Sequence, residues 1–200
     1  MYEIELKAWC ENRKTTEEKL KSFASFKEHV EKNDEYWSAN CNGKTIKLRI
    51  REEKILDGKS GQTCTSYLAT YKNKEVKKEA GKTAYEVNDE KEFSVDKPDD
   101  LRFFLRDAGF KITDLKKKST DYWSYKIREN KQASIELSEV FNLGTFVEIE
   151  ILEKTNDAET LMNTKSQLIK ILNLCGISED KIESRYYTDL LKEKSINLKT

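Results

Sequence analysis

Near its start the chain reads Tyr2-Glu3-Ile4-Glu5-Leu6-Lys7-Ala8, in which charged and apolar residues alternate. Successive side chains of a β-strand point to opposite faces of the sheet, so Glu3, Glu5 and Lys7 share one face and the apolar residues share the other. Taken alone, this pattern is typical of an ordinary strand whose charged face lies in water. The alternation becomes informative because the same pattern recurs along the chain.

Seven of the eight strands predicted below carry such a charged face, and each face tends to hold one sign of charge. After the first strand, the charged positions are Lys47, Arg49, Arg51, Lys72, Lys74, Glu90, Glu92, Lys126, Arg128, Glu136, Glu148 and Glu150. Two arrangements fit. In a β-sandwich the apolar faces form the core and the charges face water. In a barrel, amphipathic helices cover the apolar faces and the charged faces meet inside.

Hydrophobic periodicity predicts an α+β fold. The predicted strands span residues 2–10, 34–38, 45–52, 65–74, 84–95, 122–128, 134–139 and 145–152, and the predicted helices span residues 16–31, 99–108, 158–174 and 184–193. The order of elements in residues 1–75 begins again over 84–152, which indicates a pseudo-repeat within a single domain of residues 1–192, followed by a polar tail over 193–200. Short connections favour antiparallel pairing, and eight strands are enough to close a barrel.

The composition argues against several classes of function. Lys plus Arg and Asp plus Glu both number 37, so the chain has no net charge to attract nucleic acid. No apolar run approaches a membrane span and the charged start is unlike a signal peptide, so we expect a cytoplasmic protein without a membrane partner. The four cysteines form no CxxC motif, which favours reduced thiols. The one histidine, His29, lies in a helix-like stretch and is expected to be structural.

If the charged faces turn inward, the interior of the barrel cannot remain dry. Burying an ion without a partner costs several kcal/mol even after relaxation. A polyanion on the basic strands together with a divalent metal on the acidic ones would satisfy both sets of charges, because Mg²⁺ binds carboxylate, phosphate and water oxygens. The barrel arrangement therefore predicts a metal-bound linear phosphate chain as its ligand.

Several short motifs, spread in order over the chain, resemble those of one family. Residues 3–7 resemble the ExExK signature of the CYTH superfamily, the triphosphate tunnel metalloenzymes that include class IV adenylyl cyclases and thiamine triphosphatases. Residues 143–150, Leu-Gly-Thr-Phe-Val-Glu-Ile-Glu, closely match its L-G-x-F-x-E-x-E motif. Further similar segments are Asp34-Glu35-Tyr36-Trp37, Lys47-Leu48-Arg49-Ile50-Arg51, Thr70-Tyr71-Lys72, Glu90-Lys91-Glu92-Phe93 and Tyr187-Thr188-Asp189-Leu190-Leu191.

The resemblance implies a closed, antiparallel, eight-stranded β-barrel that forms a triphosphate tunnel, with helices outside. It implies Mg²⁺ or Mn²⁺ on Glu3, Glu5, Glu148 and Glu150, with Glu136 as a further acid on the late strands. The triphosphate ligands implied are Lys7, Lys47, Arg49, Arg51, Lys72, Lys74, Lys117 and Arg128, and Glu90 and Glu92 are further acids of the tunnel. Lys7 is also the candidate catalytic base.

The chain departs from the family pattern at two positions. Ser138 stands where the family usually has an Asp, and Glu136 on the same strand face could take over its acidic role. Before Tyr122 the family commonly has a Lys and an Arg, which places Lys117 at the Lys position and Ser119 at the Arg position. A bidentate arginine contact to phosphate would then be missing.

The first functional hypothesis is a class IV adenylyl cyclase-like enzyme that converts ATP to cyclic AMP and pyrophosphate, because the length and the run of motifs resemble that branch. The second is a metal-dependent triphosphatase that releases orthophosphate from tripolyphosphate, thiamine triphosphate or a nucleotide. The third is a polyphosphate or nucleotide sensor without catalysis. Class IV cyclases also suggest a homodimer.

Overall fold

The computed structural model describes residues 2–56, 62–77 and 85–197; within these ranges the side chains of residues 56, 72–77, 85–90 and 196–197 are not described. The elements, in chain order, are β1 (Tyr2–Trp9), α1 (Arg13–Phe23), β2 (Ser25–Cys41), β3 (Lys44–Leu56), β4 (Thr63–Lys77), β5 (Tyr85–Ser94), α2 (Pro98–Asp107), β6 (Lys111–Arg128), β7 (Lys131–Val140), β8 (Gly144–Glu153), α3 (Ala158–Leu174), the short 3-10 helix η1 (Glu179–Lys181) and α4 (Tyr187–Asn197). A strand, a helix and three further strands thus occur twice in succession.

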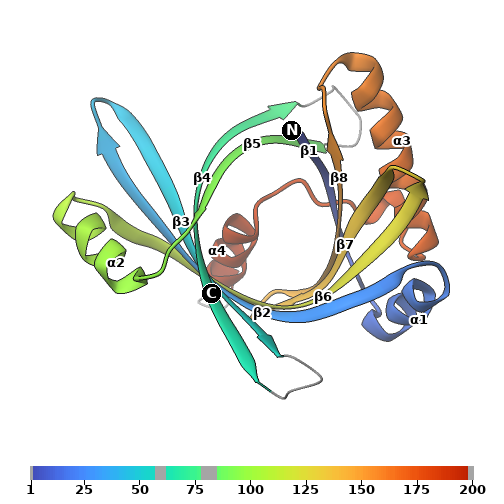
Figure 1. The fold of residues 1–200 in the computed structure, drawn as a ribbon, viewed down its shortest axis with the longest axis horizontal. Coiled ribbons are helices and arrows are strands. Elements are labelled where there is room, and N and C mark those ends of the chain that lie inside the picture. The colour runs from blue at the N-terminus through green and yellow to red at the C-terminus, as the bar shows by residue number, and fades with distance from the viewer. Residues whose placement is uncertain (1, 57–61, 78–84, 198–200) are drawn as a thin grey trace.

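The eight strands pair in the circular order β1-β5-β4-β3-β2-β6-β7-β8, and every neighbouring pair is antiparallel. Figure 1 shows the resulting ring of strands. Among the described residues, strand β1 pairs with β8 over eight residue pairs and with β5 over three, so the β1–β5 ladder is the shortest one described. The predicted α+β class, with eight antiparallel strands and flanking helices, is confirmed.

The long strand β2 contradicts the helix predicted over residues 16–31. Helix α1 begins after Asn12, whose side chain accepts a hydrogen bond from the Thr15 N–H, and it ends at Ala24, which has an extended backbone. Strand β2 then pairs with β3 on one side and β6 on the other. These two ladders override the local helical pattern, because strand preference depends strongly on tertiary context. His29 therefore lies on a strand, where its Nδ1 is 2.7 Å from Asp121 Oδ1.

Strand β6 and helix α4 also differ from their predicted bounds. The strand predicted over residues 122–128 begins at Lys111. Its additional residues pair with β2, where Lys116 lies opposite Asp34. Helix α4 continues to Asn197, so the tail predicted from residue 193 is helical as far as the structure describes it.

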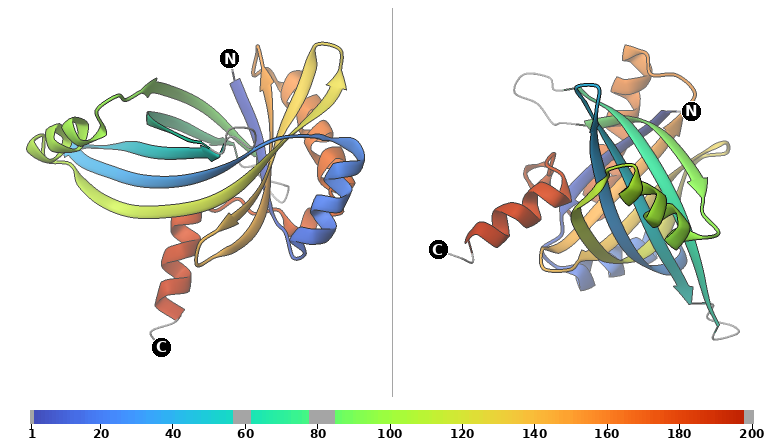
Figure 2. Two further views of the ribbon diagram at one scale, coloured as in Figure 1. Left: turned by 60° about the horizontal axis from the view of Figure 1, so that its bottom comes forward. Right: turned by 90° about the vertical axis from the view of Figure 1, so that its left-hand side faces the viewer.

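The main hydrophobic core lies outside the ring, between the strands and the helices. Ile4 and Ile149 on the outer face of β1 and β8 are fully buried and belong to the same cluster as Leu168 and Leu172 of α3. Helix α2 covers a second cluster around Trp37. Figure 2 shows α4 standing off one end of the ring. Of the two arrangements compatible with the sequence, the structure has the one in which helices cover the apolar faces.

Candidate functional site

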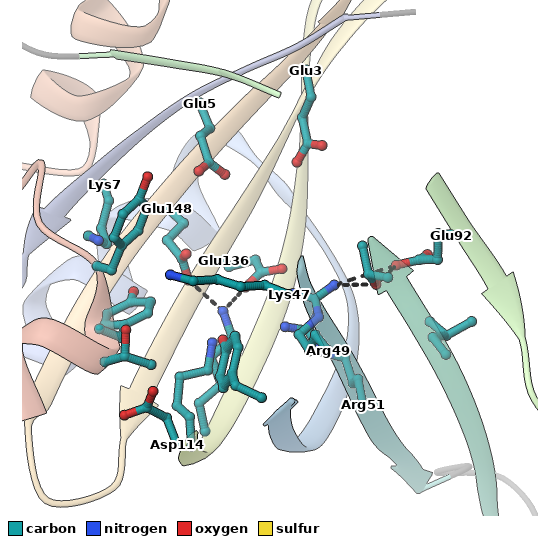
Figure 3. Close-up of a pocket in the computed structure, with 18 of the residues that line it drawn as sticks. Glu3, Glu5, Lys7, Lys47, Arg49, Arg51, Glu92, Asp114, Glu136 and Glu148 are labelled. Atoms are coloured by element: carbon teal, nitrogen blue, oxygen red, sulfur yellow. Dashed lines mark hydrogen bonds and ion pairs between the residues drawn. The ribbon is translucent and has the colours of Figure 1, made fainter. Parts of the chain in front are cut away.

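The inward faces of the strands line a cavity of about 700 Å³ that contains charges of both signs. Acidic side chains lie mainly on β1, β7 and β8, and basic ones mainly on β3 and β6. Figure 3 shows Glu3 and Glu5 reaching toward the cavity from β1, opposite Arg49 and Arg51 of β3. The predicted site residues that line this cavity are Glu3, Glu5, Lys7, Lys47, Arg49, Arg51, Glu92, Glu136, Glu148 and Glu150.

The glutamates on β1, β7 and β8 form what we call the acidic wall of the cavity: Glu3, Glu5, Glu136, Glu148 and Glu150. The strand register places them side by side. Glu5 of β1 lies opposite Glu150 of β8, and Glu136 of β7 lies opposite Glu148 of β8. Directly opposed residues of an antiparallel pair share a face, with Cβ atoms about 5 Å apart, and two like charges there destabilise the sheet. The acidic wall therefore requires cations.

Lys118 of β6 supplies one of these cations. Its ammonium lies 2.5 Å from Glu136 Oε2 and 2.5 Å from Glu148 Oε1. Burial opposes the charge of Lys118, but the two carboxylates outweigh it and raise the lysine's pKa. Lys32 of β2 lies 2.9 Å from Glu136 Oε1 and also donates to the Tyr122 hydroxyl. Burial would raise the pKa of Glu136, but Lys118 and Lys32 hold it well below its ordinary value.

The cations Lys47, Arg49 and Arg51 of β3 and Lys116 of β6 form the basic wall of the cavity. This wall is organised around one buried carboxylate, that of Asp34. Asp34 lies opposite Arg51 of β3 on one side and opposite Lys116 of β6 on the other. Arg51 donates two hydrogen bonds to Asp34, at 2.7 and 3.0 Å, and the Lys116 ammonium is 2.9 Å away. Burial would raise the pKa of Asp34, but Lys116 and Arg51 hold it well below its ordinary value. Burial lowers the pKa of Lys116 to about 8.

Arg49 lies one strand step from Arg51, on the same face of β3. It donates to the Thr70 hydroxyl at 2.9 Å and lies 3.5 Å from Glu92 Oε2. Its Nε is buried and has no hydrogen-bond partner among the described residues. A buried donor of this kind is costly unless something binds it, so Arg49 is well suited to an anionic ligand.

Lys7 is held at the end of the cavity nearest α4. Its ammonium donates to the carbonyl oxygen of Arg185 at 2.5 Å and lies 4.4 Å from the centroid of the Tyr187 ring. The backbone N–H of Glu183 donates to the Lys7 carbonyl oxygen at 2.8 Å. The segment just before α4 is therefore attached to β1, and its residues form part of the cavity wall.

Two of the predicted phosphate ligands lie away from the cavity. Lys117 is exposed on the outer face of β6, whereas Lys116 and Lys118 are buried and line the cavity, so the expectation that Lys117 enters the tunnel is wrong. Arg128 is exposed near the β6–β7 turn and lines a separate surface depression, so it does not reach the cavity. The side chains of Lys72, Lys74 and Glu90 lie outside the described residues.

The two departures from the family pattern leave the charge of the cavity intact. Ser138 is fully buried and its hydroxyl is 3.0 Å from that of Thr120, while Glu136 lines the cavity as expected. Ser119 lies beside His29, with its hydroxyl 3.2 Å from His29 Nε2, on the outer face of β6. An arginine at Ser119 would therefore not point into the cavity.

Sequence reasoning missed several buried charges around the cavity: Lys32, Asp34, Lys116 and Lys118. Three consecutive lysines, 116–118, place a cation on either face of a strand, so alternation alone cannot tell which ones point inward. Lys32 was not recognised as a strand residue, because a helix was predicted over the neighbouring residues 16–31. The usable signal was the shared parity of Lys32, Asp34 and Tyr36, which becomes visible once the strand is extended toward the N-terminus.

The acidic wall suits a divalent cation by the type of its donors. Among the residues that the structure describes, no group of three or more His, Cys, Asp or Glu side chains is already assembled as a ligand set. Glu5 and Glu150 nevertheless face each other across the β1–β8 ladder and offer carboxylate oxygens. Mg²⁺ is usually held by one or two carboxylates and completes its shell with water and phosphate oxygens. These residues therefore fit such an ion.

Comparisons with known proteins agree with the fold and the motifs. The CYTH domain profile matches residues 1–187. The PH1819 protein of Pyrococcus horikoshii OT3 has a similar structure, with a TM-score of 0.73 and 27% identity over 96% of this chain and 99% of that one. A proposed adenylate cyclase of Vibrio parahaemolyticus has a TM-score of 0.67 and 19% identity, over 96% and 98% of the two chains.

A third similar structure is HpAC1 from Hippeastrum, a proposed adenylyl cyclase described as having a dominant triphosphatase activity. Its TM-score is 0.60, with 16% identity over 96% of this chain and 95% of that one. No curated protein matches the chain, and no helix in its described parts is long and apolar enough to cross a membrane. The full-length profile match shows that the chain belongs to the CYTH domain family.

Proposed function

We propose that this protein is a metal-dependent enzyme that acts on a linear triphosphate inside the ring of strands. The observation that carries this proposal is the apposition of two walls of opposite sign across one cavity. Arg49, Arg51 and Lys116 face the cavity on the basic side, and Glu5 and Glu150 face it on the acidic side. A phosphate chain with a bound divalent cation has the matching distribution of charge.

Glu3, Glu5 and Glu150 would hold the divalent ion, with Glu148 and Glu136 next to them on the same wall. A Mg²⁺ or Mn²⁺ ion bound there would neutralise charge on the phosphate oxygens and help to orient the chain. The carboxylates on β1 and β8 keep their relative positions because the two strands pair without interruption over Tyr2–Trp9.

The basic wall would bind the phosphate oxygens and stabilise the leaving group. Arginine binds phosphate through two parallel N–H groups, and lysine binds it as a point charge. Asp34 fixes the positions of Arg51 and Lys116 before any ligand arrives. Electrostatic stabilisation by groups that are already in place is usually the largest contribution to phosphoryl and nucleotidyl transfer.

The favoured reaction is that of a class IV adenylyl cyclase, in which the ribose 3′-oxygen of ATP attacks the α-phosphorus and pyrophosphate leaves. A cavity of about 700 Å³ is larger than a bare phosphate chain needs and can accept a nucleoside as well. Lys7 is one candidate for the group that takes the 3′-hydroxyl proton.

The alternative is a triphosphatase, in which water attacks the terminal phosphorus. The observation that favours it is the concentration of charge in the cavity. The grouped carboxylates and cations would bind the metal and the phosphate chain, and hydrolysis of the chain needs no further recognition of a nucleoside. The Hippeastrum protein has a similar fold and is described as having a dominant triphosphatase activity. The fold by itself therefore does not choose between the two reactions.

Product analysis with ATP and with tripolyphosphate, in the presence of Mg²⁺ or Mn²⁺, tests the proposal. Cyclic AMP with pyrophosphate identifies the cyclase, and orthophosphate identifies the triphosphatase. Tight binding of both compounds without any product would instead identify a sensor and contradict an enzymatic role. The same assay on Glu5→Gln should show strongly reduced turnover, and unchanged turnover would remove the metal assignment.

A further inference from the structure

Lys118 occupies a position that a metal ion could otherwise take. Its ammonium is bound by two carboxylates that lie opposite each other in the β7–β8 ladder, Glu136 and Glu148. The Lys118 side chain is only 4% exposed, so water contributes little to its stabilisation. The pair of glutamates therefore owes its balance of charge to a cation that belongs to the chain.

Glu136 has both of its carboxylate oxygens engaged by ammonium groups. Lys32 lies 2.9 Å from Oε1, and Lys118 lies 2.5 Å from Oε2. Lys32 is itself 1% exposed. A divalent ion at Glu136 would have to displace one of two buried lysines, and the displaced ammonium would then lie in the interior beside a divalent charge.

The two kinds of cation cannot share the space between Glu136 and Glu148. Mg²⁺ binds carboxylate oxygens at about 2.0–2.1 Å and requires near-octahedral geometry. The Lys118 ammonium is already at hydrogen-bond distance from one oxygen of each carboxylate. Glu5 and Glu150 form a separate opposed pair in the β1–β8 ladder. Glu150 lies two residues after Glu148 on β8.

We propose that Lys118 is a built-in cation that takes the place of a second divalent ion, so that the protein without substrate binds a single Mn²⁺ ion on the Glu5 and Glu150 side of the acidic wall. This inference rests on the function proposed above. It assigns two roles within one acidic wall: Glu136 and Glu148 hold the lysine, and the carboxylates on β1 and at Glu150 hold the metal.

Isothermal titration with Mn²⁺ alone, without nucleotide or phosphate, measures the number of ions bound. The wild-type protein is expected to bind one equivalent, and Lys118→Met is expected to bind a second. Loss of Lys118 leaves Glu136 Oε2 and Glu148 Oε1 without the ammonium that bridges them, while Lys32 stays on Glu136 Oε1. Lys116→Met is the matched control. Lys116 is buried to a similar extent on the same strand but pairs with Asp34, so this variant should keep one equivalent.

The outcomes separate this inference from the proposed function. One equivalent in Lys118→Met, or two in the wild type, would overturn the role of Lys118 and leave the metal-dependent function standing. No Mn²⁺ binding to the wild type would overturn the function itself, and the inference with it.

A second variant keeps the inference testable if circular dichroism shows that Lys118→Met does not fold. In the substrate-free protein Glu148→Gln should leave Mn²⁺ affinity unchanged, whereas Glu5→Gln should weaken it by roughly tenfold or more. Equal weakening by both variants would overturn the proposal.

Discussion

The acidic and the basic wall of the cavity have opposite arrangements of buried charge. On the acidic wall a buried ammonium, Lys118, lies between two carboxylates, and a second, Lys32, binds one of them. On the basic wall one buried carboxylate, Asp34, lies between two cations, Arg51 and Lys116. Each wall thus carries its own counter-ion yet keeps a surplus of one sign. Buried charge is tolerated only when it is paired and hydrogen-bonded, so this arrangement lets both walls fold and still attract a ligand.

The largest expected effect comes from removing the central charge of the basic wall. Asp34→Asn would leave Arg51 and Lys116 side by side in the interior without their carboxylate. Breaking a buried ion pair by removing one partner costs about 3–5 kcal/mol, and we expect a loss of this size in the free energy of unfolding. Urea denaturation measures it.

The exposed Asp107 on α2 provides the matched control. Asp107→Asn should change the free energy of unfolding by no more than about 0.5 kcal/mol, as surface substitutions usually do. If the two variants lost similar stability, Asp34 would not be the centre of a buried cluster, and the comparison between the walls would fail.

The next largest effect distinguishes two neighbouring lysines of β6. Lys116 lines the cavity and Lys117 is exposed outside it. Removing one positioned charge that stabilises a transition state typically costs about 10²–10³ in rate. We therefore expect Lys116→Met to lower kcat/KM for the triphosphate substrate by about this factor, and Lys117→Met to leave it unchanged. A loss with Lys117→Met in steady-state assays would contradict the assignment.

The sequence predicted the acidic wall better than the basic one, for a physical reason. Glu3, Glu5, Glu148 and Glu150 alternate strictly with apolar residues that pack against the helices, so one face of each strand was unambiguous. The run Lys116–Lys118 has no such alternation, and its inward residues are set by pairing with β2. That pairing is a long-range interaction, which local periodicity does not contain.

Long-range strand pairing also explains the error at residues 16–31. Local sequence there permits a helix, and only the ladders on both sides of β2 extend the strand back to Ser25. Lys32 became recognisable as a buried strand residue beside the cavity only once that extension was known, whereas Asp34 already began the strand predicted over residues 34–38. The fold could therefore be predicted from periodicity and motifs, whereas the buried ion pairs that organise the cavity depend on register.

A third test compares how stability depends on pH. The ordinary lysine pKa is 10.5, but burial lowers the pKa of Lys116 to about 8 in the folded protein. Between these values the unfolded chain binds more protons at this residue, so its contribution to the free energy of unfolding rises with pH. The stability of the wild type should therefore increase relative to that of Lys116→Met from about pH 8 to 10. Parallel pH curves for the two proteins would contradict the lowered pKa.

The smallest expected effect concerns the rim of the basic wall. Lys47 lines the cavity but is exposed, so salt screens its charge. Lys47→Met should raise KM only a few-fold at low ionic strength, through weaker steering of the anionic substrate. The difference from the wild type should disappear in high salt. A large, salt-independent loss would instead place Lys47 among the buried residues that bind phosphate directly.

A crystal structure of the protein with Mn²⁺ and tripolyphosphate, with anomalous scattering recorded for manganese, would show where the metal and the phosphate chain bind. The phosphate chain should lie inside the ring against Arg49, Arg51 and Lys116, with one manganese peak beside Glu5 and Glu150. A phosphate chain bound on the outer surface, or a manganese peak between Glu136 and Glu148 with Lys118 displaced, would contradict the roles proposed for the two walls.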